Sequence, residues 1–165
     1  METRDIRLTI EEYNSPEELG NEDRKLLEAA RTAAAMAYAP YSGFSVGAAV
    51  RMADGRVITG NNQENSAYPS GLCAERVALF HAQSLYPKTA VSSIAIYARA
   101  DNFKLDRPVT PCGSCRQVLA EYENRHKSPI RILMAGESGR IFAASDIGQL
   151  LPLSFQLDEL KINRL

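Results

Sequence analysis

The spacing of apolar residues along the chain predicts three helices. In residues 21–38, leucines and alanines recur every three or four positions, as on the buried face of an amphipathic helix. Asn21 is placed to cap the start of this helix, and Pro40 follows its end. The same spacing predicts two further helices, over residues 73–86 and 112–124.

Short apolar runs between these helices predict strands. Residues 44–51 and 57–60 flank a turn pair at 54–55, Asp-Gly, which is typical of a β-hairpin. Three further strands are expected over residues 92–98, 130–135 and 140–144. The hairpin makes the resulting sheet mixed, because its two strands run in opposite directions.

The order of these elements predicts a single α/β domain. Strands that alternate with helices favour a layered arrangement, so we expect a three-layer fold. Its central mixed sheet would have about five strands, with helices on both faces. A chain of 165 residues without an internal repeat or linker is about one domain long, here residues 21–165. Residues 1–20 are expected to be an N-terminal extension, in which Ile6, Leu8 and Ile10 alternate with polar residues as in a short half-buried strand.

Net charge and hydropathy argue against two classes of binding partner, nucleic acids and membranes. The formal net charge is −1, from 19 basic and 20 acidic side chains, so the basic surplus that nucleic-acid binding usually requires is missing. No stretch approaches the roughly 18 apolar residues of a membrane span, and the first residues lack the apolar run of a secretory signal. We therefore expect a cytoplasmic protein with neither a nucleic-acid nor a membrane partner.

Three cysteines carry the clearest chemical signal. Cys73, and the pair formed by Cys112 and Cys115, each stand at a predicted helix start after a loop. Two thiolates spaced as Cys-x-x-Cys can converge on one tetrahedral zinc ion. Taken alone, the pair also fits a thioredoxin-like redox site or half of a structural zinc site. The redox interpretation leaves Cys73 without a role.

The two histidines decide whether a zinc site would be closed. His81 stands eight residues after Cys73 on the same predicted helix, about 12 Å away, and His126 is farther still from Cys115. Neither is expected to reach the ion. The fourth ligand is then most simply water, and an open fourth position marks a catalytic zinc, one per chain.

Glu75 and Arg76 follow the first cysteine directly. A glutamate in the first turn of a helix often serves only the backbone donors and the helix dipole. Two residues after a zinc ligand, Glu75 can instead take a proton from the bound water and pass it on, as in zinc nucleobase deaminases. Three thiolates leave a net charge of −1 on Zn²⁺, and we expect Arg76 to offset it by donating to a thiolate; a plain surface arginine is the alternative.

Several separated motifs together resemble the small, single-domain, homotetrameric cytidine deaminases. The resemblance runs from about residue 26 to 160, and its markers are residues 39–49, 62–65, 73–76, 111–117 and 150–155. It implies the cytidine-deaminase-like fold and hydrolysis of cytidine and 2′-deoxycytidine to the uracil nucleosides and ammonia. It also implies a homotetramer with sites shared between subunits.

The resemblance assigns the substrate contacts as well. It implies that Asn62 and Glu64 bind the ribose hydroxyls and that Phe44 forms a wall of the pocket. Phe155 is expected to reach the base bound by a neighbouring subunit, and the backbone N–H of Ala74 to meet the edge of the base. Without the resemblance, the two polar residues would be a loop after a strand, and each phenylalanine plain core.

Three rival functions remain at this point. A small-molecule deaminase of the blasticidin S type is disfavoured by Glu64 and Arg76. A polynucleotide or tRNA editor is disfavoured by the charge balance. A zinc-binding interaction domain without activity predicts a closed metal site.

Overall fold

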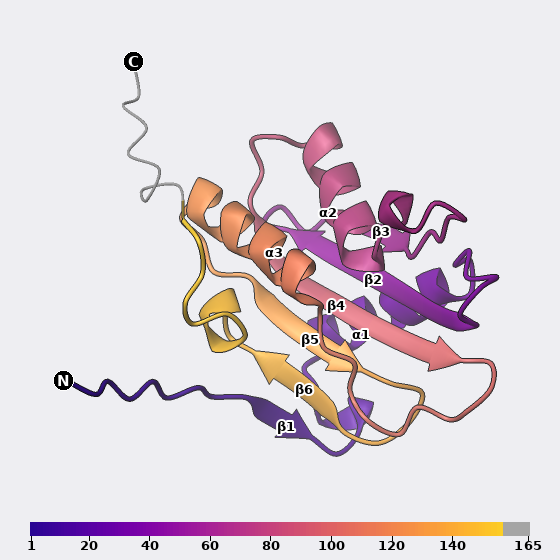
Figure 1. Cartoon of the computed structure of the whole chain (residues 1–165), viewed down its shortest axis with the longest axis horizontal. Coiled ribbons are helices and arrows are strands. Elements are labelled where there is room, and N and C mark those ends of the chain that lie inside the picture. Colours follow the sequence, from indigo (N-terminus) through magenta and orange to yellow (C-terminus); the bar gives the residue numbers. More distant parts are fainter. Residues whose placement is uncertain (157–165) are drawn as a thin grey trace.

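A single mixed sheet of six strands organises the chain (Figure 1). The structure is a computed structural model and describes residues 1–156. In chain order the strands are β1 (Glu11–Tyr13), β2 (Phe44–Met52), β3 (Val57–Asn61), β4 (Val91–Ala100), β5 (Arg131–Ala135) and β6 (Ile141–Ala144). Their order across the sheet is β1-β6-β5-β4-β2-β3, and only the β4–β5 pair is parallel.

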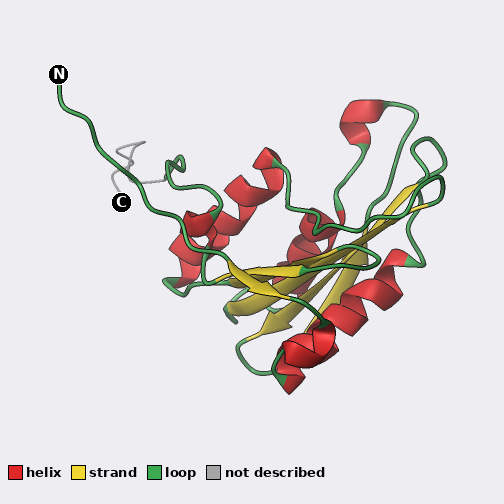
Figure 2. Cartoon of the chain, turned by 90° about the horizontal axis from the view of Figure 1, so that it is seen from below, coloured by secondary structure: helices red, strands yellow, loops and turns green. Residues whose placement is uncertain are grey.

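Helices cover both faces of this sheet (Figure 2), as predicted. Helix α1 (Asn21–Ala34) packs on one face, and helices α2 (Ala74–Leu85) and α3 (Gly113–His126) pack on the other. Successive strand residues alternate between the two cores: Ala48 and Val50 contact the α2 and α3 side, whereas Ala49 contacts the α1 side. The three-layer α/β fold is therefore confirmed, with six strands in place of about five.

The first helix departs from its predicted ends. Its N-cap residue is Gly20, and Asn21 is already the first helical residue. The helix ends at Ala34 and not near Tyr38, because the backbone of Tyr38 pairs with the 62–64 segment instead. Tyr38 N–H donates to Asn62 O at 3.0 Å, and Glu64 N–H donates to Tyr38 O at 2.8 Å.

The predicted strand near the N-terminus was placed wrongly. Ile6, Leu8 and Ile10 are exposed and lie in no strand, whereas the next three residues form β1 against β6. Two ion pairs accompany this pairing, and Tyr13 packs against the core on the α1 side. The Arg131 guanidinium contacts Glu11 at 2.6 Å, and the Arg140 guanidinium contacts Glu12 at 2.6 Å.

An ion cluster joins β1 to the α1 face of the sheet. The carboxylate of Asp23 lies between two arginines, at 3.0 Å from Arg51 and 2.9 Å from Arg131. Arg131 also donates to the hydroxyl of Tyr13 at 3.0 Å. This cluster anchors part of residues 1–20 to the sheet, and the division into a 1–20 extension and a 21–165 domain stays a prediction.

Two glycines allow helices to approach strands at backbone distance. A Cβ atom at Gly47 would lie 2.0 Å from Ala30 O, and one at Gly60 would lie 2.5 Å from Ala78 N. Such separations are impossible for real atoms, so any side chain at either position would push α1 or α2 away from the sheet. The contact at Gly60 fixes α2, which begins immediately after Cys73, against β3.

No helix within residues 1–156 is long and apolar enough to cross a membrane.

Candidate metal centre and substrate pocket

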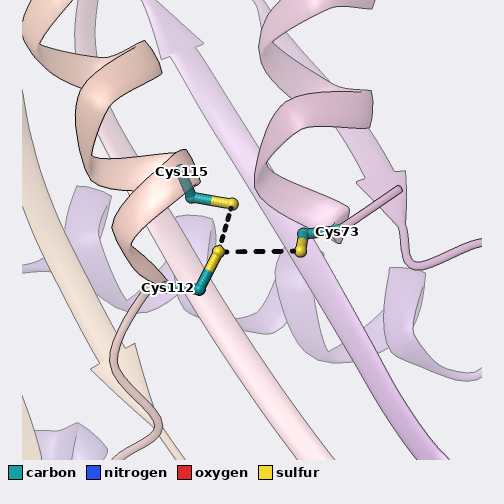
Figure 3. A group of neighbouring side chains, drawn as sticks. All are labelled: Cys73, Cys112 and Cys115. Atoms are coloured by element: carbon teal, nitrogen blue, oxygen red, sulfur yellow. Dashed lines mark hydrogen bonds between the residues drawn. The ribbon is translucent and has the colours of Figure 1, made fainter. Parts of the chain in front are cut away.

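The three cysteines converge where α2 and α3 begin (Figure 3). Cys73 and Cys112 are the N-cap residues of these two helices, and Cys115 lies in the first turn of α3. The Sγ atoms of Cys73 and Cys112 are 3.9 Å apart, and those of Cys112 and Cys115 are 3.5 Å apart. The loops and helix starts thus bring together residues that are 39 positions apart in the chain.

This geometry fits a tetrahedral zinc ion. Zn–S bonds of about 2.3 Å place neighbouring sulfurs about 3.8 Å apart, between the two distances observed. All three ligand atoms lie within 4.8 Å of one another. Three sulfur donors favour zinc over hard cations such as Mg²⁺ or Ca²⁺, which bind oxygen.

The surroundings of Cys73 favour its thiolate form. A hydrogen bond from Cys115, and then one from the Arg76 guanidinium, lower the pKa of Cys73 to about 5 against the opposing effect of burial. The same thiol pair, together with burial, raises the pKa of Cys115. Both helix N-termini add partial positive charge at the cluster, which further favours sulfur anions.

No histidine joins the cysteines in the described part of the chain. The metal-binding group found there contains Cys73, Cys112 and Cys115 alone. His126 is held elsewhere, with its Nε2 atom 3.0 Å from Gln83 Oε1 between α2 and α3. The prediction that both histidines lie out of reach agrees with this arrangement, and the described residues supply three ligands to the metal.

Glu75 and Arg76 lie in the first turn of α2, shortly after Cys73. The side chain of Glu75 is 5% exposed, and this burial raises its pKa above the ordinary glutamate value. Arg76 Nη2 lies 3.8 Å from Cys73 Sγ. Its Nε atom is buried without a hydrogen-bond partner among the residues described. Arg76 is thus partly buried with its guanidinium toward a thiol, and its role in offsetting the charge of the cluster stays a prediction.

An open cavity of about 720 Å³ leads to the cysteines. Its walls come from four segments: residues 41–46, residues 62–75, Ile96 on β4, and the 109–112 loop. Cys73, Ala74, Glu75 and Cys112 lie in its lining, so the predicted metal site and the predicted acid–base residue open into one space. The cavity size is in the ordinary range for a small-molecule site.

The predicted sugar-binding residues line this same cavity. Asn62 is fixed by strand β2, because its Oδ1 accepts from Val46 N–H at 2.8 Å and its Nδ2 donates to Phe44 O at 2.9 Å. Glu64 accepts hydrogen bonds from the backbone N–H groups of Tyr41 at 2.9 Å and Ser42 at 3.3 Å. Hydrogen bonds led by that from the Ser42 hydroxyl lower the pKa of Glu64, which favours its anion.

Phe155 lies outside this group. Its side chain is 56% exposed and does not line the cavity of its own chain, while its backbone carbonyl accepts a hydrogen bond from Gln117 at 2.8 Å. The predicted roles of Phe155 and of the other site residues therefore stay predictions.

Sequence reasoning gave no role to Ser42 or to the aromatic pair at the cavity. Tyr41 and Tyr68 both line the cavity and meet edge to face, with ring centroids 6.2 Å apart. Ser42 contacts Glu64 across 22 residues of chain. Ser42 stands inside the 39–49 motif, but only the folded loop shows which residue its hydroxyl contacts.

Comparison with known proteins agrees with this picture. Residues 20–127 match the family model described as the cytidine and deoxycytidylate deaminase zinc-binding region. A cytidine deaminase of Halalkalibacterium halodurans is 41% identical over 124 residues, which are 75% of this chain and 86% of that protein. A cytidine deaminase of Mycobacterium tuberculosis is 38% identical over 138 residues, 82% of this chain and 90% of that protein.

Solved structures give the same result for the fold. The crystal structure of the cytidine deaminase from Burkholderia pseudomallei superposes with a TM-score of 0.70 at 38% identity, and covers 79% of this chain and 97% of that one. The structure from Mycobacterium tuberculosis superposes with a TM-score of 0.62 at 34% identity, and covers 81% and 96%.

Proposed function

This chain belongs to the cytidine and deoxycytidylate deaminase family, and we propose that it hydrolyses cytidine and 2′-deoxycytidine to the corresponding uracil nucleosides and ammonia. The observation that carries the proposal is the cluster of three thiols beside the buried carboxyl group of Glu75, open to a small-molecule cavity. This arrangement combines a metal site with a proton carrier, which deamination by water requires.

Cys73, Cys112 and Cys115 would hold one zinc ion. When bound, zinc polarises a water molecule and lowers the pKa of that water. Arg76 donates toward Cys73 and, with the two helix N-termini, offsets the excess negative charge of three thiolates.

Glu75 carries the protons of the reaction. Its carboxylate takes a proton from the water and delivers it to N3 of the cytosine ring. It then moves the second proton to the 4-amino group, which leaves as ammonia, while the water oxygen becomes the 4-oxo group of uracil. Burial suits this task, because a raised pKa brings a carboxyl group closer to the working pH at which it must both accept and donate.

The cavity favours a nucleoside over a nucleotide. Among the described residues that line it, none is a lysine, arginine or histidine, whereas Glu64 and Glu75 contribute carboxyl groups. These described residues of one chain would therefore offer a 5′-phosphate no cationic partner, and their carboxylates would repel it. Asn62 and Glu64 instead offer an amide and a carboxylate, which suit sugar hydroxyls. Phe44 supplies an apolar wall, and the backbone N–H of Ala74 the partner for the base edge.

The assembly is proposed to be a homotetramer in which each site includes Phe155 of a neighbouring subunit. Leu153 and Phe155 are 82% and 56% exposed, as expected for residues that find their partners on another subunit. Light scattering measures this directly: a stable, fully active monomer would remove the shared-site part of the proposal.

The first experiment follows the ultraviolet change as cytidine is converted to uridine by zinc-loaded protein. Glu75→Ala is expected to retain zinc and lose activity by about 10³-fold or more, because the proton carrier acts twice. Glu121→Ala, which removes an exposed glutamate from α3, is the matched control and is expected to retain activity. If zinc-loaded wild-type protein leaves cytidine and deoxycytidine unchanged, the nucleoside proposal falls.

A further inference from the structure

Ser42 lies at the centre of a chain of hydrogen bonds along one wall of the cavity. Phe44 N–H donates to Ser42 Oγ at 3.0 Å, and the Ser42 hydroxyl donates to Glu64 Oε1 at 2.5 Å. The backbone N–H of Ser42 donates to the other carboxylate oxygen at 3.3 Å. One serine thus contacts both Glu64 and the backbone of Phe44, the two residues that flank the sugar end of the proposed site.

The direction of these bonds is settled by the groups involved. A backbone N–H can only donate, so Ser42 Oγ accepts from Phe44 and has its single proton left for a carboxylate that can only accept. With Tyr41 N–H at 2.9 Å, the carboxylate receives three donors. An ionised carboxylate has about four acceptor positions, so about one is left for a ligand.

Glu64 needs such support because it is not held by packing. It lies partly exposed in the loop after β3, and the described residues give it no ion pair with an arginine or lysine. A glutamate side chain that is fixed in one rotamer loses conformational entropy. If that ordering were left to the substrate, it would weaken binding, whereas donors already in place make the carboxylate preorganised.

We propose that Ser42 is a positioning residue, which holds the Glu64 carboxylate in the orientation that accepts a hydrogen bond from a sugar hydroxyl. The inference rests on the proposed nucleoside function and adds the residue that sets substrate affinity at the sugar end. Ser42 acts through Glu64, so its contribution depends on that carboxylate. A serine that merely stabilised the loop would contribute whether or not Glu64 was charged.

A double-mutant cycle on the zinc-loaded full chain separates these two roles. Ser42→Ala, Glu64→Gln and the double variant are assayed with cytidine, with zinc content and thermal unfolding measured for each. Ser42→Ala is expected to lower kcat/KM about tenfold, mostly through KM, as the loss of one hydrogen bond to a charged group implies. In the Glu64→Gln background the same substitution is expected to change kcat/KM by less than about threefold.

Two further variants complete the test. Ser42→Thr keeps a hydroxyl and is expected to restore most of the affinity that alanine loses. Ser145→Ala removes another serine that bonds a carboxylate, at 2.6 Å from Asp146 and away from the cavity, and is expected to leave KM unchanged. The inference is overturned if Ser42→Ala leaves kcat/KM within twofold of wild type. It is also overturned if Ser42→Ala lowers kcat/KM as much in the Glu64→Gln background as in the wild type. Failure of wild-type protein to convert cytidine would instead overturn the proposed function itself.

Discussion

The two ends of this molecule handle charge in opposite ways. At the β1 edge every charge named above has a partner of opposite sign: Arg131 contacts Glu11 and Asp23, and Arg51 contacts Asp23. At the starts of α2 and α3, three thiols and the carboxyl group of Glu75 gather, and Arg76 contacts one of the thiols. Acidic groups gathered in a cavity are typical of a site that binds a cation or a substrate, whereas paired charges at a sheet edge stabilise the fold.

The largest expected effect comes from removing a sulfur at the helix starts. Cys112→Ala should lower the bound zinc well below one ion per chain and reduce kcat on the order of 10⁴-fold, because two thiols hold the ion poorly and Glu75 then has no polarised water to act on. Metal analysis and the cytidine assay measure both quantities. Ser114→Ala, in the same first turn, should leave zinc in place. Full zinc content in the Cys112 variant would show that the ion is held elsewhere.

The next effect tests the β1 edge. Arg131→Ala should leave kcat unchanged and lower the free energy of unfolding by about 2 kcal/mol, because it leaves the mostly buried Asp23 with one arginine fewer. The pair with Glu11 is half exposed and adds less to this figure, since solvent screens it. Thermal unfolding should show a fall in Tm of roughly 4–8 °C.

The pH dependence of this loss provides its control. The hydrogen bond from Arg131 lowers the pKa of Glu11, so the stabilisation is present above the ordinary glutamate pKa and is lost as pH falls through the lowered value. The part of the Tm difference that comes from the Glu11 pair should therefore shrink as pH falls from 7 toward 3. Arg140→Ala, which removes a more exposed pair, should cause a smaller shift. A difference that grows in acid would contradict the ion-pair explanation.

The smallest effect is expected from Arg76, the cation beside the thiols at the start of α2. Arg76→Gln should retain zinc but lower kcat about tenfold, because the thiolate charge is then less well offset and the bound water becomes less acidic. The measurement is turnover per zinc ion. Arg76→Lys keeps the positive charge but lacks the planar set of donors, so its turnover should lie between those of the wild type and of Arg76→Gln. Unchanged turnover in a zinc-replete glutamine variant would mean that Arg76 belongs with the structural charges after all.

Sequence alone predicts the helix-start region well and the β1 edge poorly. Residue type and local spacing are enough to predict the metal site of Cys73, Cys112 and Cys115, because these residues stand at helix starts, which are local features. Arg131, which pairs with both Glu11 and Asp23, lies over 100 residues away from each of them in the chain. Apolar alternation at Ile6 to Ile10 points to the wrong segment. Pairing between distant charges leaves no periodic pattern to detect.

Sequence predicts the sugar end of the site less well than the helix-start region and better than the β1 edge. The resemblance marks Asn62 and Glu64, but the side-chain amide of Asn62 is engaged with β2, and the carboxylate of Glu64 with the loop at Ser42. Such contacts depend on where a loop folds back, which neither propensity nor spacing fixes. Phe155 is predicted to contact the site of a neighbouring subunit, and the structure of a single chain does not contain that contact.

The absence of a side chain at Gly60 has a consequence for the dimensions of the site. The strand that carries Gly60 leads directly to Asn62, while the helix it touches begins directly after Cys73. This backbone contact therefore holds together the two elements that lead to the metal site and to the proposed sugar end. A side chain at position 60 would push α2 from β3, and so would move Cys73 relative to Asn62 although Gly60 does not line the cavity.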